Sequence, residues 1–225
     1  MRRFGVGALA LLLAATACSK GSDTANPKRD AAKAARLVLL PEDLPDGFAA
    51  REHKVDAAEK QSEDDLAACL HLPPASAVND ADERGKDFVR GLGTESQSVR
   101  SAAFYAKSSA AVSSATRATR SQQFKDCVKA TSAKLFTARS PSIQIDGLQV
   151  DDRSFPSYGD ATTGYRLHTT ISVAPTSLDL FADVVVYTKG RARVTATFNA
   201  VGKPFPDADE AALAKLLGKR LERRG

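Results

Sequence analysis

The sequence predicts an α+β fold, in which an antiparallel β-sheet is flanked by helices and forms a single domain. Apolar residues recur every three or four positions over residues 122–136, which is the spacing of one helix face. Between residues 165 and 198 they alternate with polar residues, which is the period of strands. Helices first, then consecutive strands and a closing helix, are typical of α+β rather than alternating α/β proteins.

The first half of the chain is predicted to be mostly helical. A short amphipathic helix over 30–40 ends at the turn 41–48, where two prolines exclude further helix. A second helix begins near Ser62, which can cap an acidic first turn, and ends at Pro73-Pro74. We expect a polar loop over 75–85, a strand over 98–105, and helices over 107–118 and 122–136.

The second half is predicted to form strands over 165–173, 180–187 and 192–198, followed by a helix from Asp207. Thr188-Lys189-Gly190 forms a tight turn between the last two strands. The last strand would turn Ala192, Val194, Ala196 and Phe198 to the core, and Arg191, Arg193, Thr195 and Thr197 outward. The final helix carries a buried stripe of Leu213, Leu216, Leu217 and Leu221.

The N-terminus has the parts of a secretory signal peptide over residues 1–17. Arg2 and Arg3 precede an uncharged run, Phe4–Ala17, that is shorter than the roughly 20 residues a membrane-spanning helix needs. Small residues then lead into Cys18, as in bacterial lipoprotein signals. We therefore expect Cys18 to be lipidated, residues 18–33 to be a flexible tether and 34–225 to be the folded domain. The alternative is an ordinary signal cut near Ala17 that leaves Cys18 as a free thiol.

The leader also predicts where the protein resides. Diacylglyceryl-Cys18 would hold the domain at the outer face of the cell membrane, and each buried CH₂ contributes about 0.8 kcal/mol to such anchoring. Once Arg2 and Arg3 are removed, the chain has 30 Lys and Arg residues and 27 Asp and Glu residues, and these charges are spread along the chain. This mild excess gives no reason to expect a nucleic-acid partner.

Cys69 and Cys127 remain as a pair if Cys18 is lipidated. Outside the cytoplasm nothing keeps thiols reduced, so we expect one disulfide that ties together two helical faces. Two buried free thiols are the alternative.

Several segments together resemble the extracellular sensor domains of the PknH type, which occur on actinobacterial Ser/Thr kinases and as free lipoproteins. The resemblance covers most of residues 35–222 and rests on the order and spacing of its pieces. These are Leu44-Pro45-Asp46-Gly47-Phe48, the run 99–118, Phe124-Lys125-Asp126-Cys127, Gly159-Asp160, the hairpin 184–194 and the final helix. The resemblance implies an antiparallel sheet flanked by helices and a cleft proposed to bind a ligand.

No motif predicts catalysis, a metal or a cofactor. His53, His71 and His168 are far apart in sequence, whereas zinc needs clustered ligands. The segment 80–85 begins like a calcium loop but places Arg84 where an oxygen ligand is required. The chain has no Gly-x-Ser-x-Gly, and the acidic pairs at 63–65 and 151–152 suit loops and helix starts as well as glycosidases.

Four basic residues on the polar sides of two predicted strands are candidate ligand contacts. If the strands neighbour each other, Arg166, His168, Arg191 and Arg193 would form a basic face for an anionic head group or a cell-wall polymer. The alternative is a sheet face kept soluble by charge. Cations on the last helix complement its dipole and could also touch anionic lipid.

Three functions are open from the sequence. The first is a non-catalytic binding or sensing module for a small molecule, lipid or envelope polymer, with its pocket between the sheet and the helices that contain Cys69 and Cys127. The second is an envelope protein that works by protein contact alone. The third is a hydrolase with scattered catalytic residues. A large apolar cavity would favour the first, and a flat exposed apolar patch the second.

Overall fold

The computed structural model describes residues 25–139, 144–173 and 176–225, and every structural statement below concerns these ranges. The expected signal peptide over 1–17 and the expected lipidation site Cys18 lie outside them. Within the described ranges, no helix has the length and apolar character required to cross a membrane.

The core of the fold is an eight-stranded sheet, which confirms the predicted α+β class. Its strands run in the order β1-β3-β4-β8-β7-β6-β5, with β2 paired to β4 outside this path, and every named pairing is antiparallel. The strands are β1 (Ala49–Arg51), β2 (Asn79–Arg84), β3 (Asp87–Arg90), β4 (Gln97–Ala106), β5 (Gln144–Asp152), β6 (Ala161–Val173), β7 (Thr176–Lys189) and β8 (Ala192–Val201).

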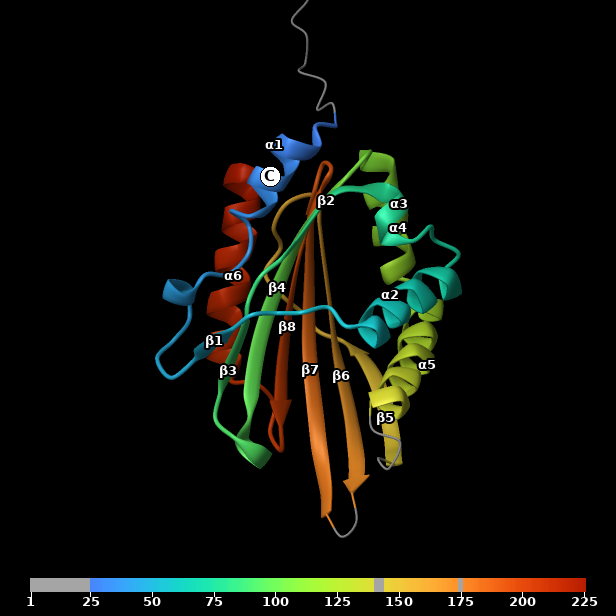
Figure 1. Cartoon of the computed structure of the whole chain (residues 1–225), viewed down its shortest axis with the longest axis vertical. Coiled ribbons are helices and arrows are strands. Elements are labelled where there is room, and N and C mark those ends of the chain that lie inside the picture. The colour runs from blue at the N-terminus through green and yellow to red at the C-terminus, as the bar shows by residue number, and fades with distance from the viewer. Residues whose placement is uncertain (1–24, 140–143, 174–175) are drawn as a thin grey trace, which may run out of the picture.

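Helices cover both faces of this sheet (Figure 1). On one face lie α1 (Pro27–Ala34) and α6 (Asp207–Arg224), and on the other lie α2 (Ala57–Cys69), α3 (Ala75–Val78), α4 (Ser109–Thr119) and α5 (Gln122–Arg139). Two short 3₁₀ turns, η1 (Pro41–Asp43) and η2 (Gly93–Glu95), complete the elements.

The main core lies between the sheet and α6. Along β8, Ala192, Val194, Ala196 and Phe198 are all fully buried, as their alternation predicts. They belong to one apolar cluster with the stripe of α6, in which Leu213, Leu217 and Leu221 are buried and Leu216 is partly buried. Burying each such leucine stabilises the fold by about 1.5–3 kcal/mol.

The clearest differences from the sequence prediction concern three segments. Helix α1 spans Pro27–Ala34 rather than 30–40, and it begins within the expected tether because Asn26 caps it by accepting from the N–H of Arg29 at 3.1 Å. Helix α2 begins at Ala57 rather than near Ser62, because Asp56 caps it through the N–H of Glu59 at 2.7 Å. The segment 75–84 is not a loop: it forms α3 and β2, since β2 pairs with the long strand β4.

Candidate ligand-binding cavity

A cavity of about 580 Å³ lies on the sheet face opposite α6. Its floor comes from β2, β4, β8, β7 and β6, and its roof from α2, α3, α4 and α5. The cavity lies at the location predicted from the sequence, between the sheet and the helices that carry Cys69 and Cys127. The volume falls within the range of about 300–1,000 Å³ that is usual for small-molecule sites.

The cavity wall is mostly apolar, with hydroxyl groups on its floor. Its large apolar lining residues are Leu66, Leu70, Leu72, Val78, Phe104, Val112, Phe124, Tyr165, Val184 and Val186. Thr163, Thr188, Thr195 and Thr197 add hydroxyls from three strands. Thr195 and Thr197 were expected to point outward. They do lie on the sheet face opposite the core around α6, but on that face they line the cavity.

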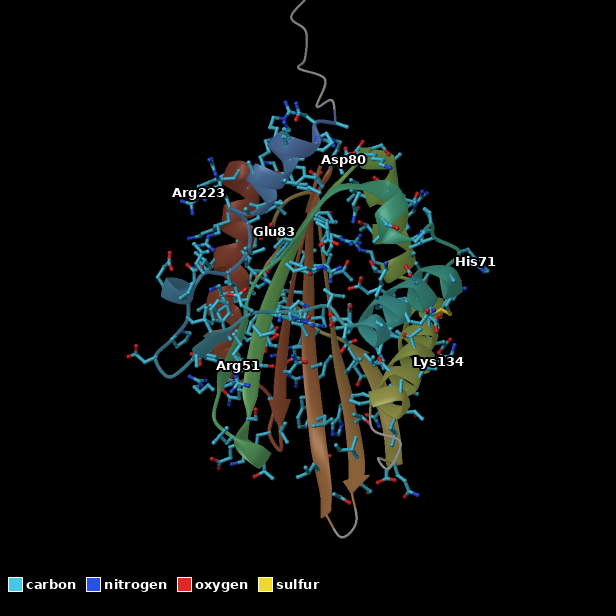
Figure 2. The ribbon with its side chains drawn as sticks, viewed as in Figure 1. Arg51, His71, Asp80, Glu83, Lys134 and Arg223 are labelled. Atoms are coloured by element: carbon cyan, nitrogen blue, oxygen red, sulfur yellow. A yellow bond between two sulfur atoms is a disulfide. The ribbon has the colours of Figure 1, made fainter. Side chains whose placement is uncertain are left out.

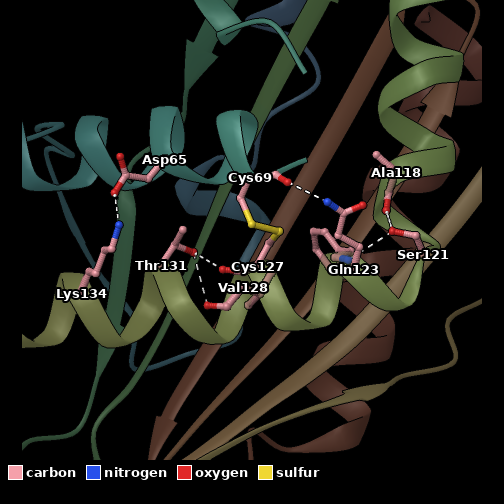
Figure 3. The surroundings of a disulfide bond; sticks show 10 residues. Asp65, Cys69, Ala118, Ser121, Gln123, Cys127, Val128, Thr131 and Lys134 are labelled. Carbon is pink, nitrogen blue, oxygen red and sulfur yellow. Dashed lines mark hydrogen bonds and ion pairs between the residues drawn. A yellow bond between two sulfur atoms is a disulfide. The ribbon is translucent and has the colours of Figure 1, made fainter. Parts of the chain in front are cut away.

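The roof helices α2 and α5 are tied together by the predicted disulfide. Cys69 and Cys127 are bonded, with their Cα atoms 5.8 Å apart (Figure 3). On either side of the bond, Lys134 Nζ lies 3.2 Å from Asp65 Oδ2, and Gln123 Nε2 donates to the carbonyl oxygen of Cys69 at 2.9 Å. These contacts hold the two helices as one unit over the sheet.

Arg193 projects from the middle of the floor into the cavity. Its guanidinium lies over the ring of Phe104, its cross-strand neighbour, at 4.5 Å from the ring centre. The Nε atom is buried without a hydrogen-bond partner. In the ranges that the structure describes, the other guanidinium nitrogens also form no hydrogen bond or ion pair. Burial lowers the pKa of Arg193, because an apolar environment disfavours the charged form.

The other cations around the cavity have acidic partners. Arg84 binds Glu63 at 2.6 Å and Asp82 at 2.8 Å, and Arg100 binds Glu59 at 2.9 Å. These pairs neutralise the wall at both residues. Burial lowers the pKa of Arg84, but the hydrogen bonds that it donates to the two carboxylates outweigh this effect and raise its pKa.

Arg191 is also paired, and its partners lie at the end of the cavity nearest α1. Its Nη2 lies 2.7 Å from Asp30 Oδ2, and its Nη1 lies 3.3 Å from Asp80 Oδ2 and donates to the carbonyl oxygen of Ala106 at 2.6 Å. Asp30 is fully buried. Arg191 therefore has a structural role, since it joins α1 to β2 and β4.

Tyr165 contributes a second polar group without a partner. Its ring packs edge-on against Phe124, with the ring centres 4.9 Å apart. In the described part of the chain its hydroxyl forms no hydrogen bond. Burial raises the pKa of Tyr165 to about 12, and the nearby charge of Arg193 acts in the opposite direction.

The condition for a shared basic face, that the two strands are neighbours, is not met. Strand β7 separates β6 from β8, and Arg166 and His168 lie on the α6 face while Arg191 and Arg193 line the cavity. Arg166 forms a bidentate pair with Asp183 at 2.6 and 2.5 Å, which raises its pKa. His168 lies 3.2 Å from Asp179 and stacks on Phe181. Neither side chain reaches the cavity.

A second cluster of charges lies on the α6 face. Arg153 binds Asp207 at 2.5 Å and Glu210 at 3.2 Å, and Asp183 is nearby. Burial raises the pKa of Glu210 to about 7, and Asp183 adds to this effect. This cluster connects α6 to the sheet, whereas the cavity is lined by α2, α3, α4 and α5, which lie on the opposite side of the sheet (Figure 1).

The histidines do not come together. His53 lines the cavity, with Nδ1 at 3.0 Å from Asp87 and Nε2 at 3.5 Å from Glu59. His71 lies at the outer end of the helical layer (Figure 2). Within the described ranges, no group of three or more His, Cys, Asp or Glu is arranged to hold a metal ion.

Comparisons with known proteins give a fold-level similarity. No protein-family model matches the chain. No curated protein is significantly similar to it.

Two solved structures from Mycobacterium tuberculosis resemble it. The extracellular domain of PknH is 10% identical over 89% of this chain and 98% of that one, with a TM-score of 0.38. LpqN, described as involved in cell envelope biogenesis, is 12% identical over 83% and 80%, with a TM-score of 0.32. The PknH-type resemblance seen in the sequence thus recurs in the structural comparison. At these values it carries no argument about what this chain binds.

Proposed function

We propose that this protein is a lipid-anchored, extracytoplasmic and non-catalytic binding module, whose cavity holds a mostly apolar small molecule. The observation that supports this best is the cavity of about 580 Å³ between the sheet and a disulfide-tied helical roof. A fold of this size could close that space with larger side chains. Small residues surround it instead, among them Ala67, Ala102, Ala111 and Ala115.

The cavity wall offers no arrangement for nucleophilic catalysis. His53 is its general-base candidate, but each ring nitrogen already faces a carboxylate, Asp87 or Glu59. In the described ranges no serine or cysteine forms a hydrogen bond with His53. A nucleophile next to an available base is what such catalysis requires, so binding accounts better for this site.

Filling the cavity from its floor should abolish ligand binding. Ala102 lies on β4 beside Thr195 and Arg84, is largely buried and lines the cavity. The added ring of Ala102→Phe would extend into the empty space rather than into the α6 core. We expect the neutral apolar dye N-phenylnaphthylamine to bind the wild-type domain with a rise in fluorescence, and to bind the variant at least about tenfold more weakly.

Ala212→Phe is the matched control, because Ala212 is exposed on α6, which lies across the sheet from the helices that line the cavity. It should bind the dye as the wild type does, and circular dichroism should show both variants folded. Equal dye binding by the wild type and folded Ala102→Phe would contradict the proposed function.

The anchor is tested separately at Cys18. In bacteria that express the full chain, Cys18→Ser should move the protein from the membrane fraction to the soluble fraction, because it removes the lipid-bearing thiol. Ser19→Ala, which keeps the cysteine, is the control. Membrane association that persists in Cys18→Ser would remove the anchor from the proposal.

A further inference from the structure

The inference concerns the chemical class of the ligand, and it rests on the proposed function. It starts from the uneven charge of the cavity wall. Arg84, Arg100 and Arg191 each have carboxylate partners, whereas Arg193 has none in the described ranges. The wall therefore presents one guanidinium without a bonded carboxylate to a mostly apolar space, and Asp82 and Glu63, the partners of Arg84, act on its charge only from a distance.

Such a group is costly unless an anion joins it. A buried ionised side chain loses several kcal/mol of hydration, which only pairing or hydrogen bonding restores. The ring of Phe104, at 4.5 Å, offsets part of this loss through a cation–π contact. The Arg84 guanidinium also lies over the Phe104 ring, at 5.1 Å from its centre, but it donates its hydrogen bonds to Glu63 and Asp82. The donors of Arg193 remain available to a ligand.

Tyr165 adds a second donor to the same cavity. Its hydroxyl has no hydrogen-bond partner in the part of the chain that is described, and its ring packs against Phe124, another residue of the cavity wall. A guanidinium and a phenol that line one apolar cavity are both donors to an acidic head group, since a carboxylate accepts several hydrogen bonds.

We propose that the cavity binds an amphiphile with an acidic head group, in which Arg193 pairs with a carboxylate and Tyr165 donates a hydrogen bond to it. The apolar body of the ligand lies along Phe124, Val184 and Leu66 beneath the roof helices. The site recognises an acidic group that is joined to an apolar chain. A lipid with such a head group and a free long-chain acid would therefore both fit it.

Dodecanoate and dodecanol test this directly, because they share an apolar chain and differ in the head group. Binding is measured by displacement of N-phenylnaphthylamine from the wild-type domain at neutral pH, below the concentration at which either probe forms micelles or droplets. Since a hydrogen bond to a charged group contributes about 1.5–3 kcal/mol, dodecanoate should bind about tenfold to hundredfold more tightly than dodecanol.

Arg193→Met should remove this preference and leave dodecanol affinity unchanged within about twofold. Arg193→Lys should keep part of the preference, because the charge remains but the bidentate geometry is lost. Arg117→Met is the control for charge at a distance, since Arg117 is an exposed cation on the roof helix α4. It should retain the full preference.

The outcomes separate the two proposals. Equal affinity of the wild type for the two probes would overturn the acidic head group and leave the apolar cavity in place. A dye that binds and is displaced by neither probe would also overturn it. Absence of dye binding in the wild type would remove the proposed function, and the inference with it. If Arg193→Met does not fold, the wild-type preference alone decides.

Discussion

Arg191→Met should lower the free energy of unfolding by about 3–5 kcal/mol, because it removes the nearest cation from the buried Asp30 carboxylate, while Arg29 Nε lies farther away, at 3.7 Å. Asp30 is fully buried, and Arg191 lies 2.7 Å from it. Burial alone would raise the pKa of Asp30, but the hydrogen bonds from Arg191 and the Asn26 N–H leave it below its usual value. Urea unfolding at pH 7 measures the loss.

The pH dependence gives this prediction a second readout. A carboxyl with a lowered folded-state pKa stabilises the fold above its unfolded pKa, and that stability is lost as the pH falls through the folded value. The difference between wild type and Arg191→Met should therefore be largest at neutral pH and shrink below about pH 4. Adding Asp30→Asn should recover part of the lost stability, since it removes the buried negative charge that Arg191 balances in the wild type. A loss under about 1 kcal/mol at pH 7 would contradict the structural role given to Arg191.

Removing the disulfide should have an effect of similar size. The Cys69–Cys127 bond spans a sequence separation of 58, so its loss should cost about 4 kcal/mol through the greater entropy of the unfolded chain. Replacing both cysteines by alanine is preferable to a single change, because it leaves no odd thiol. Thermal and urea unfolding of this double variant, compared with the wild type, measure the loss.

The wild type treated with reductant under mild denaturant should lose the same stability as the double variant. A variant that also binds the dye more weakly would link the roof helices to the cavity. Equal unfolding midpoints for the oxidised wild type and the double variant would remove the disulfide from the account of stability. Peptide mapping that finds free thiols at both Cys69 and Cys127 would show that the bond is absent.

The buried residues of β8 and α6 could be predicted from the sequence, because the spacing of apolar residues within one strand or one helix shows which of its sides is buried. The alternation of β6 was misleading for a related reason. Tyr165 and Leu167 pack against the small cluster around Phe124, whereas Val194 and Phe198 pack against α6. Helices cover both faces of the sheet, so "core-facing" describes opposite faces on these two strands. The periodicity of a strand shows that one of its faces is buried. It does not show on which side of the sheet that face lies, or which helix covers it.

Sequence reasoning singled out Arg193 but gave it the wrong neighbours. Whether its side chain meets solvent, a carboxylate or a cavity depends on where α4 and α5 lie over the sheet, which no local pattern specifies. The partner of Arg191 was missed for the same reason, since Asp30 is 161 residues away in the chain. Helix α1 was accordingly expected to be largely tether. A buried ion pair between such distant positions leaves no periodic signal in the sequence.

Native mass spectrometry tests the central claim most directly, using protein purified under non-denaturing conditions from bacteria that express the full chain. The wild type and the Ala212→Phe control should carry a bound molecule of defined mass, whose fragments include an apolar chain and an acidic group. Ala102→Phe should be detected at the mass of the ligand-free protein. A wild-type protein that is bare, and that takes up neither the dye nor dodecanoate when they are added, would contradict the claim that the cavity is a binding site.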